Sequence, residues 1–210
     1  MEPFGNRTAG SGRARSTRAL DNLQAGLRER LEALVRDNQR LKQSARMTHD
    51  LLDALARLGE ITDLTALCEQ AVQTFIGVFT LRGAAISVVE ARDAGRLSLA
   101  RHQGWEAVEP DDLVFEADSS LVAALREEKK PLSVLALVGK TGPRSKERSV
   151  LRRLECELVV PLARGDRVLG VLLLTRRADG SPLSAAEIEL LTIFSSFFPI
   201  VIENILLRKA

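Results

Sequence analysis

Few side chains in this sequence have the type and spacing that catalysis or metal binding requires. The two cysteines, Cys68 and Cys156, stand far apart and form neither a disulfide framework nor a zinc motif. The two histidines, His49 and His102, cannot complete a metal site by themselves, and their spacing to serines and acids predicts no catalytic triad. We therefore expect no metal, no cofactor and no enzymatic activity, with both thiols partly buried in a reducing cytoplasm.

One short stretch, VGKTGPRSK at residues 138–146, resembles the loop that binds nucleotide phosphates. That loop needs a further glycine several residues before its Gly-Lys-Thr triplet. Val134 and Leu135 stand at this distance before Gly139. We therefore interpret the triplet as a false match and expect no phosphate-binding loop here.

The composition is that of an ordinary globular protein, with 45% hydrophobic residues, 28% charged residues and a net charge of +2. Arginines are concentrated in residues 1–19 among small polar residues, which predicts a disordered basic tail. The tail lacks interleaved aromatic residues, so a nucleic-acid partner is not expected. No signal-peptide core follows the arginines, and strictly apolar runs such as 171–174 are too short to span a bilayer. We expect a cytoplasmic protein with no membrane contact.

Leucines recur at heptad spacing through residues 20–58, which predicts a long helix that pairs as a coiled coil. Asn38 occupies an inner heptad position, where a buried asparagine favours a parallel, in-register homodimer. The alternative is a single amphipathic helix lying on its own domain, with Asn38 facing water, and Gln24, Ala45 and Thr48 at inner positions keep it open. The residues expected to dimerise here are Leu27, Leu31, Leu34, Asn38, Leu41, Leu52 and Leu55.

After residue 59 the pattern changes to short helices and strands, which predicts an α+β domain over 59–210 built on an antiparallel sheet. The expected elements are a helix over 64–79, a hairpin turning at 93–95, a helix over about 119–129, a strand over 132–138, a hairpin turning at 165–166 and a terminal helix. Asp63 is expected to cap the first helix, and Asp118 or Ser119 the second. Ser184 and Glu187 form a capping box before the terminal helix.

The terminal helix is apolar nearly all round, which is more apolar surface than one contact with a sheet can cover. We expect a second surface to cover the remaining apolar area of the helix, and a partner chain is the first candidate for it. The residues expected to dimerise on this helix are Phe194, Phe198, Val201 and Ile205.

The segment 157–207, ELVVPLARGDRVLGVLLLTRRADGSPLSAAEIELLTIFSSFFPIVIENILL, resembles the C-terminal half of a GAF domain. The shared features are the apolar-Pro-Leu strand, the glycine at the turn, the Gly-Val-Leu-x-Leu strand and the terminal apolar-Glu-Asn-x-x-Leu. The resemblance extends over about 48–208 and is loose across 105–150, where ligands bind in the family. It implies a GAF-like antiparallel sheet flanked by helices, preceded by the long coiled-coil helix.

The residues that the known activities of this family require are not found at matching positions in this sequence. Cyclic-nucleotide GAF domains carry an Asn-Lys…Phe…Asp-Glu signature, whereas EEKKPL at 127–132 has no asparagine before its lysines. Bilin-binding GAF domains need a cysteine after the second strand, and the free-methionine sulfoxide reductases need redox cysteines in the central loops. Cys68 is expected on a helix and Cys156 at the start of a later strand, so neither thiol matches.

The most promising ligand or partner candidates lie in two charged segments, the acidic 106–118 and the basic 140–153. The resemblance places both near the mouth of the family's pocket, where they would recognise an anionic ligand or a charged partner surface. The alternative is two solvated loops of opposite sign, with Trp105 filling the core instead of lining a pocket. The candidates are Trp105, Asp118, Ser119, Arg144, Lys146 and Arg148.

Together these patterns predict a non-enzymatic, homodimeric regulatory module of signal transduction that senses a small ligand or binds a protein partner. The alternative is a ligand-free adaptor or scaffold that uses the GAF fold and the coiled coil for dimerisation and partner docking. The expected organisation is a basic tail over 1–19, a coiled-coil helix over 20–58 and a GAF-like domain over 59–210.

Overall fold

The computed structural model of the protein describes residues 9–89, 95–105, 108–140 and 146–209. By its internal contacts the chain divides into two compact units, Met1–Arg46 and Met47–Ala210. Helix α1 (Ala9–Gly59) begins inside the segment 1–19, so residues 9–19 are helical where the sequence predicted disorder. Arginine and alanine are good helix formers, and the only proline near this end is Pro3, before the helix begins.

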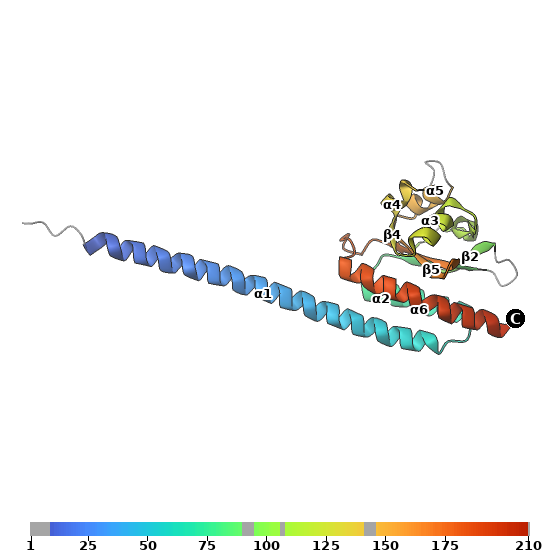
Figure 1. Cartoon of the computed structure of the whole chain (residues 1–210), viewed down its shortest axis with the longest axis horizontal. Helices are drawn as coiled ribbons and strands as arrows, with labels where there is room; N and C mark the ends of the chain where they lie inside the picture. Colours follow the sequence, from blue (N-terminus) through green and yellow to red (C-terminus); the bar gives the residue numbers. More distant parts are fainter. Residues whose placement is uncertain (1–8, 90–94, 106–107, 141–145, 210) are drawn as a thin grey trace, which may run out of the picture. The chain divides into compact units, whose positions relative to one another are not determined.

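The second unit is built around a six-stranded antiparallel sheet with the strand order β3-β2-β1-β6-β5-β4. Its helices are α2 (Leu64–Phe79), α3 (Ser120–Glu128), α4 (Val134–Val138), α5 (Lys146–Arg153) and α6 (Ala185–Lys209), with a short 3-10 helix η1 (Pro110–Leu113). Its strands are β1 (Ala84–Val89), β2 (Arg96–Gln103), β3 (Phe115–Glu116), β4 (Leu132–Ser133), β5 (Cys156–Arg164) and β6 (Arg167–Thr175). Figure 1 shows α2 and α6 on one face of the sheet and α3, α4 and α5 on the other. The predicted α+β class, an antiparallel sheet flanked by helices, is confirmed.

The predicted helix caps are present. The Asp63 carboxylate accepts a hydrogen bond from the Ala66 N–H at 3.0 Å. The Ser119 hydroxyl, and not the exposed Asp118, caps α3 by accepting from the Val122 N–H at 3.3 Å. The capping box before α6 is reciprocal: the Ser184 N–H donates to Glu187 at 2.7 Å, and the Glu187 N–H donates to the Ser184 hydroxyl at 3.4 Å. These polar groups satisfy helix-end donors that would otherwise lack partners.

The strands of both predicted hairpins pair antiparallel, β1 with β2 and β5 with β6, while Asp93 and Ala94 of the first predicted turn lie outside the described residues. The predicted strand over 132–138 is wrong. Only Leu132–Ser133 pair with β5, and Val134–Val138 form helix α4. The Ser133 hydroxyl accepts from the Ala136 N–H at 3.1 Å and so starts a helix where the sequence predicted a continuing strand. A short apolar run does not by itself distinguish a buried strand from a buried helix. The basic segment beyond it, expected to be a loop, contains helix α5.

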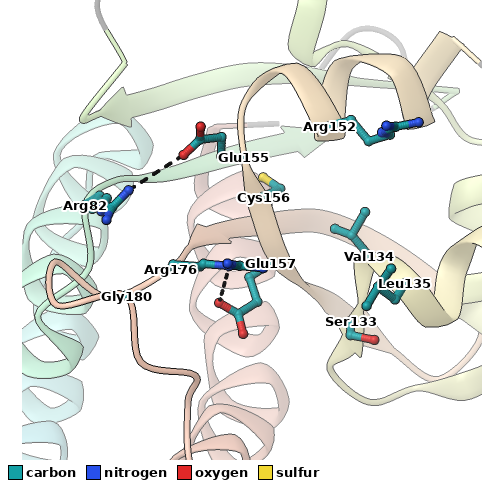
Figure 2. Close-up of a pocket in the computed structure, with 10 residues that line it drawn as sticks. All are labelled: Arg82, Ser133, Val134, Leu135, Arg152, Glu155, Cys156, Glu157, Arg176 and Gly180. Carbon is teal, nitrogen blue, oxygen red and sulfur yellow. Dashed lines mark ion pairs between the residues drawn. The ribbon is translucent and has the colours of Figure 1, made fainter.

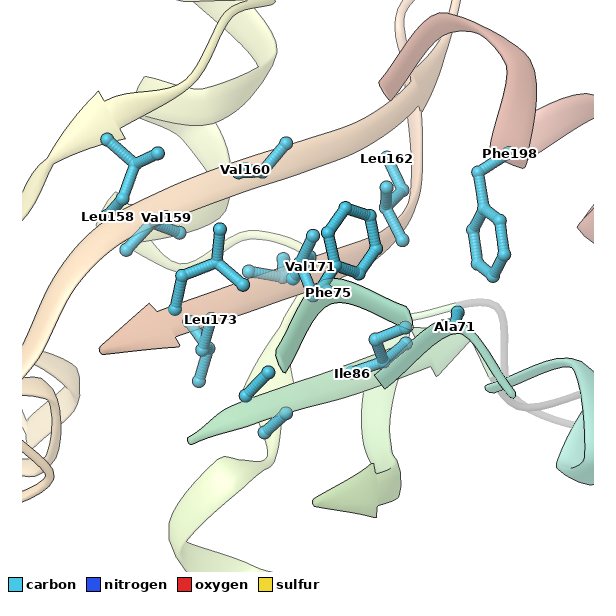
Figure 3. Close-up of a cluster of buried hydrophobic side chains, with 14 of the residues drawn as sticks. Ala71, Phe75, Ile86, Leu158, Val159, Val160, Leu162, Val171, Leu173 and Phe198 are labelled. Atoms are coloured by element: carbon cyan, nitrogen blue, oxygen red, sulfur yellow. The ribbon is translucent and has the colours of Figure 1, made fainter. Parts of the chain in front are cut away.

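The core contains side chains from the sheet and from the helices on both of its faces. The ring of Phe194 lies edge-on to Phe75 at 4.3 Å between centroids and stacks on Phe198 at 4.7 Å. Figure 3 shows Phe75 of α2 and Phe198 of α6 among the side chains of the central strands. Leu51 and Leu58, near the end of α1, belong to the same buried cluster.

This packing separates the apolar residues of α6 into two sets. Phe194, Phe198, Val201 and Ile205, which the sequence suggested for dimerisation, are buried in the chain's own core, and so is Leu55 of α1. These side chains are therefore already covered within one chain. The large apolar side chains of α6 that stay exposed are Ile193, Phe197, Ile200 and Leu207, with exposed fractions of 36–70%.

Helix α6 is long and apolar enough over Ala185–Arg208 to cross a bilayer, by length and composition alone. The sequence did not suggest this because Ser195 and Ser196 interrupt the strictly apolar runs without much lowering the average hydropathy. Half of its most apolar window is buried within the protein. Core helices that pack against a sheet meet the same criteria of length and composition.

Replacing Phe194 by Ala should lower the free energy of unfolding by about 3–5 kcal/mol, because it removes a fully buried ring that contacts two other rings. Phe194→Leu keeps most of the volume and should cost roughly 1.5 kcal/mol or less. Urea unfolding followed by the fluorescence of Trp105, the single tryptophan, measures both. Equal losses for the two variants would contradict the assigned position of this ring.

Candidate functional site

The acidic and basic segments that the sequence singled out lie side by side in the structure. They line a shallow hollow of about 360 Å³ together with Arg96 at the start of β2. Arg153 of α5 forms an ion pair with Asp112 of η1, and Arg96 forms one with Asp111 at 3.9 Å. The two segments therefore neutralise each other in part. An anionic ligand at this position would have to compete with the chain's own carboxylates.

The five candidate residues that the structure describes do not gather into one site. The Trp105 indole N–H donates to the Leu154 carbonyl at 2.8 Å, so this half-buried ring connects the end of β2 to the end of α5 and packs against the core. Lys146 lines the hollow of about 360 Å³. Asp118 and Ser119 lie at the start of α3, and Arg148 is half-buried in α5. Arg144 lies outside the described residues.

Both thiols are buried within the protein. Burial raises the pKa of Cys68 from 9.0 to about 12, with a smaller contribution from the Asp63 carboxylate. Burial alone raises the pKa of Cys156 to about 12. A thiol in this state has almost no thiolate at neutral pH, and the thiolate is the reactive form. Among the described residues, no three His, Cys, Asp or Glu side chains are grouped so as to hold a metal ion.

A larger hollow, of about 590 Å³, lies where β4 leaves the sheet and β5 begins, and the sequence did not predict it. Arg82 precedes β1, Arg152 lies in the last turn of α5 and Arg176 follows β6, so three separate parts of the chain contribute an arginine to its wall. Figure 2 shows Arg82 and Arg176 beside Glu155 and Glu157, with which they pair at 3.8 Å and 3.6 Å, and Arg152 farther along on α5. Of the described residues that line this hollow, only Arg152 belongs to one of the two charged segments that the sequence singled out.

Comparison with known proteins identifies the fold. The sequence model described as "GAF domain" matches residues 64–204. The chain belongs to the GAF domain family. This match includes the sheet, the helices α2 to α5 and most of α6, and confirms the resemblance seen in the sequence. None of the curated proteins compared with the chain matches it.

Several solved structures share the fold at low sequence identity. The GAF domain of a phosphoenolpyruvate-protein phosphotransferase from Coxiella burnetii is 15% identical, with a TM-score of 0.59 over 77% of this chain and 95% of that one. Residues 122 to 287 of a methyl-accepting chemotaxis protein are 14% identical, with a TM-score of 0.57 over 75% and 99%. Free methionine-R-sulfoxide reductase from Neisseria meningitidis, solved with its substrate, is 16% identical, with a TM-score of 0.54 over 76% and 90%. At these identities the likeness shows the GAF fold alone. GAF domains are generally regulatory modules, although some of the similar proteins are enzymes.

Neither native thiol should react with Ellman's reagent at neutral pH while this GAF protein is folded, because burial keeps both in the protonated form. Both should react after denaturation in guanidinium, and an added cysteine at the exposed Ala123 of α3 should react at once. Their raised pKa values also stabilise the fold below pH 9.0, and this contribution is lost as the pH rises toward about 12. Fast reaction of either native thiol in the folded protein would contradict the assigned burial.

Proposed function

We propose that this GAF protein is a non-enzymatic, homodimeric regulatory module of signal transduction in the cytoplasm, which responds to a small ligand or a protein partner and needs no cofactor. The observation that carries the proposal is the apolar surface that a single chain leaves exposed on two helices. Large exposed apolar areas on a globular protein are typical of interaction sites. The absence of a reactive thiol in the described residues supports a regulatory role over a redox one.

On α1, the described heptad leucines are largely exposed in one chain. Leu27, Leu31, Leu34 and Leu41 have exposed fractions of 58–71%, and Asn38 is also exposed. A second copy in parallel register would bury these leucines in knobs-into-holes contacts. Full burial of a leucine side chain contributes about 1.5–3 kcal/mol, so a few such layers offset the entropy that association costs.

On α6, the exposed apolar residues follow one face of the helix. Ile193, Phe197, Ile200 and Leu207 are separated by four, three and seven positions, which is the spacing of one helical stripe. Asn204 is exposed on the same stripe. We assign this stripe to the homodimer in place of the buried Phe194, Phe198, Val201 and Ile205.

A buried ion pair offers a route by which the sheet would act on α6. Arg177 follows β6 and pairs with Glu187, which is buried in the first turn of α6. Breaking a buried pair is costly, because one charge is left without its partner. A displacement of the end of β6 is therefore passed to the start of α6. A ligand would act through its different affinities for two arrangements of these helices.

An adaptor that binds a protein and no small ligand is the second candidate. The ion pairs of the acidic segment favour it, since Arg153 of the basic segment and Arg96 of β2 are both engaged by carboxylates of the same chain. Spin labels at Leu34 and Thr48, measured with and without cell metabolites, distinguish the two functions. A regulatory module gives distances that change with the metabolites, whereas an adaptor gives one constant distribution.

The double substitution Ile193→Glu with Phe197→Glu should shift the protein from dimer toward monomer, because it places charges in the proposed apolar interface. Sedimentation equilibrium at micromolar concentration measures the change. Ala123→Glu adds a charge to an exposed position of α3, on the opposite face of the sheet, and should leave the dimer intact. A monomeric wild-type protein would overturn the proposed homodimer.

Replacing Asn38 by Leu should raise the thermal stability while allowing oligomers other than the dimer. The reason is that leucine at an inner heptad position gains burial but loses the amide pairing that selects two parallel chains. Melting curves and light scattering after size exclusion measure both effects. If Asn38→Leu stayed strictly dimeric, Asn38 would not determine the register.

A further inference from the structure

The larger hollow lies beside an edge of the sheet where strand pairing ends. Strand β4 pairs with β5 only at Leu132 with Val159 and at Ser133 with Leu158, and at Val134 the chain turns away into α4. The start of β5, Cys156 and Glu157, extends past this pairing and lines the hollow. In the described part of the sheet no strand lies beyond it on that side. An uncovered strand edge offers backbone groups that can pair with another chain.

The charges of this hollow favour an acidic ligand. The described lining includes three arginines, Arg82, Arg152 and Arg176, and two glutamates, Glu155 and Glu157. Arg82 pairs with Glu155 at 3.8 Å and Arg176 with Glu157 at 3.6 Å, and both distances are longer than a hydrogen bond. Among the described residues Arg152 has no carboxylate within ion-pair distance, so its guanidinium is available to bind a carboxylate.

The hollow also contains an exposed apolar contact. Leu135 of α4 lines it with an exposed fraction of 84%, the highest among the large apolar residues described. Figure 2 shows Leu135 and Val134 on the wall beside β5, across from Arg176. A free inorganic anion would use the arginines but not the leucine or the strand edge. None of the described residues that line the hollow carries an aromatic ring on which a nucleic-acid base could stack.

The backbone at the start of β5 departs from regular strand geometry. The pairing of β5 with β6 shifts register between Cys156 and Leu158, which makes Glu157 the extra residue of a β-bulge. Glu155 has a φ of 50°, a left-handed conformation that is uncommon for a residue other than glycine. Bulges often lie beside binding sites, where they redirect a side chain or end the pairing of strands.

We propose that the β5-edge groove, formed by Arg82, Arg152, Arg176, Leu135 and the start of β5, binds an extended acidic segment of a partner protein. The segment pairs with the open edge of β5 as an added strand. Its carboxylates engage Arg152 and Arg176, and one of its apolar side chains packs on Leu135 and Val134. This inference names the partner class for the proposed regulatory function, but it uses none of the dimer residues. Loss of dimerisation and loss of peptide binding are therefore separate outcomes.

The test uses the full chain and a displayed library of random dodecapeptides. Selection should enrich peptides that carry several Asp or Glu and at least one large apolar residue. A fluorescein-labelled copy of the strongest peptide is then titrated with the protein by fluorescence anisotropy. Arg152→Glu and Leu135→Ser should each weaken binding by about tenfold or more, whereas Arg167→Glu, an exposed arginine at the start of β6, should change it by less than about twofold.

Two further arms test the charge pairing and the strand pairing. A peptide whose acids are changed to lysine should bind the Arg152→Glu variant better than the wild-type protein. A peptide with N-methylated backbone amides, which cannot donate to a strand edge, should lose binding by about tenfold or more. Circular dichroism confirms that each variant is folded.

Several results would overturn the proposal. They are enrichment of no acidic peptide, full affinity of the selected peptide for Arg152→Glu, and full affinity of the N-methylated peptide. Inorganic phosphate or a single-stranded oligonucleotide that displaces the peptide, together with unchanged binding by Leu135→Ser, would identify a simple anion site instead.

Discussion

The central strands of the sheet are apolar on both faces, and the rest of the fold depends on covering both. All six residues of β1 are buried, and so are the last seven of β6. The one polar side chain within β1, Ser87, is also buried, and its hydroxyl donates to the Leu113 carbonyl at 2.7 Å. Because each face needs apolar cover, α2 and α6 pack on one side and α3 to α5 on the other. The last turns of α1 complete the first of these layers with Leu51 and Leu58.

Covering the sheet leaves two surfaces without cover in a single chain. Helix α6 has more apolar surface than its contact with the sheet can bury, so one stripe of it faces outward. Strand β4 is too short to follow β5 along its whole length, so the start of β5 has an open edge. The two surfaces differ in chemistry: the first is apolar and suits a like helix, whereas the second combines arginines with one leucine and suits an acidic chain. The segment from Arg176 to Glu187 leads from one to the other along the chain.

The sequence predicted the parts of this structure that depend on local chemistry. Turn residues placed the hairpin of β5 and β6, strand patterns predicted the pairing of β1 with β2, and capping residues placed the starts of α2, α3 and α6. The prediction failed at 132–138, where an apolar run satisfies a strand and a buried helix equally and the Ser133 cap decides. It also did not distinguish Phe194 from Phe197, since on a helix that is apolar all round only tertiary packing determines which ring faces inward. The β5-edge groove was beyond prediction, because its arginines are distant in sequence and meet only after the sheet has formed.

The burial of both thiols has a practical consequence for how this protein can be studied. A cysteine introduced at an exposed position can be labelled without first removing Cys68 and Cys156, which lie in the packed interior. Because Cys68 and Cys156 are left unchanged, the core keeps its packing, and the labelled protein differs from the natural one only at the probe. Fluorophore pairs on α1, on α6 and beside the β5-edge groove would then report the movements of each surface in an otherwise native chain.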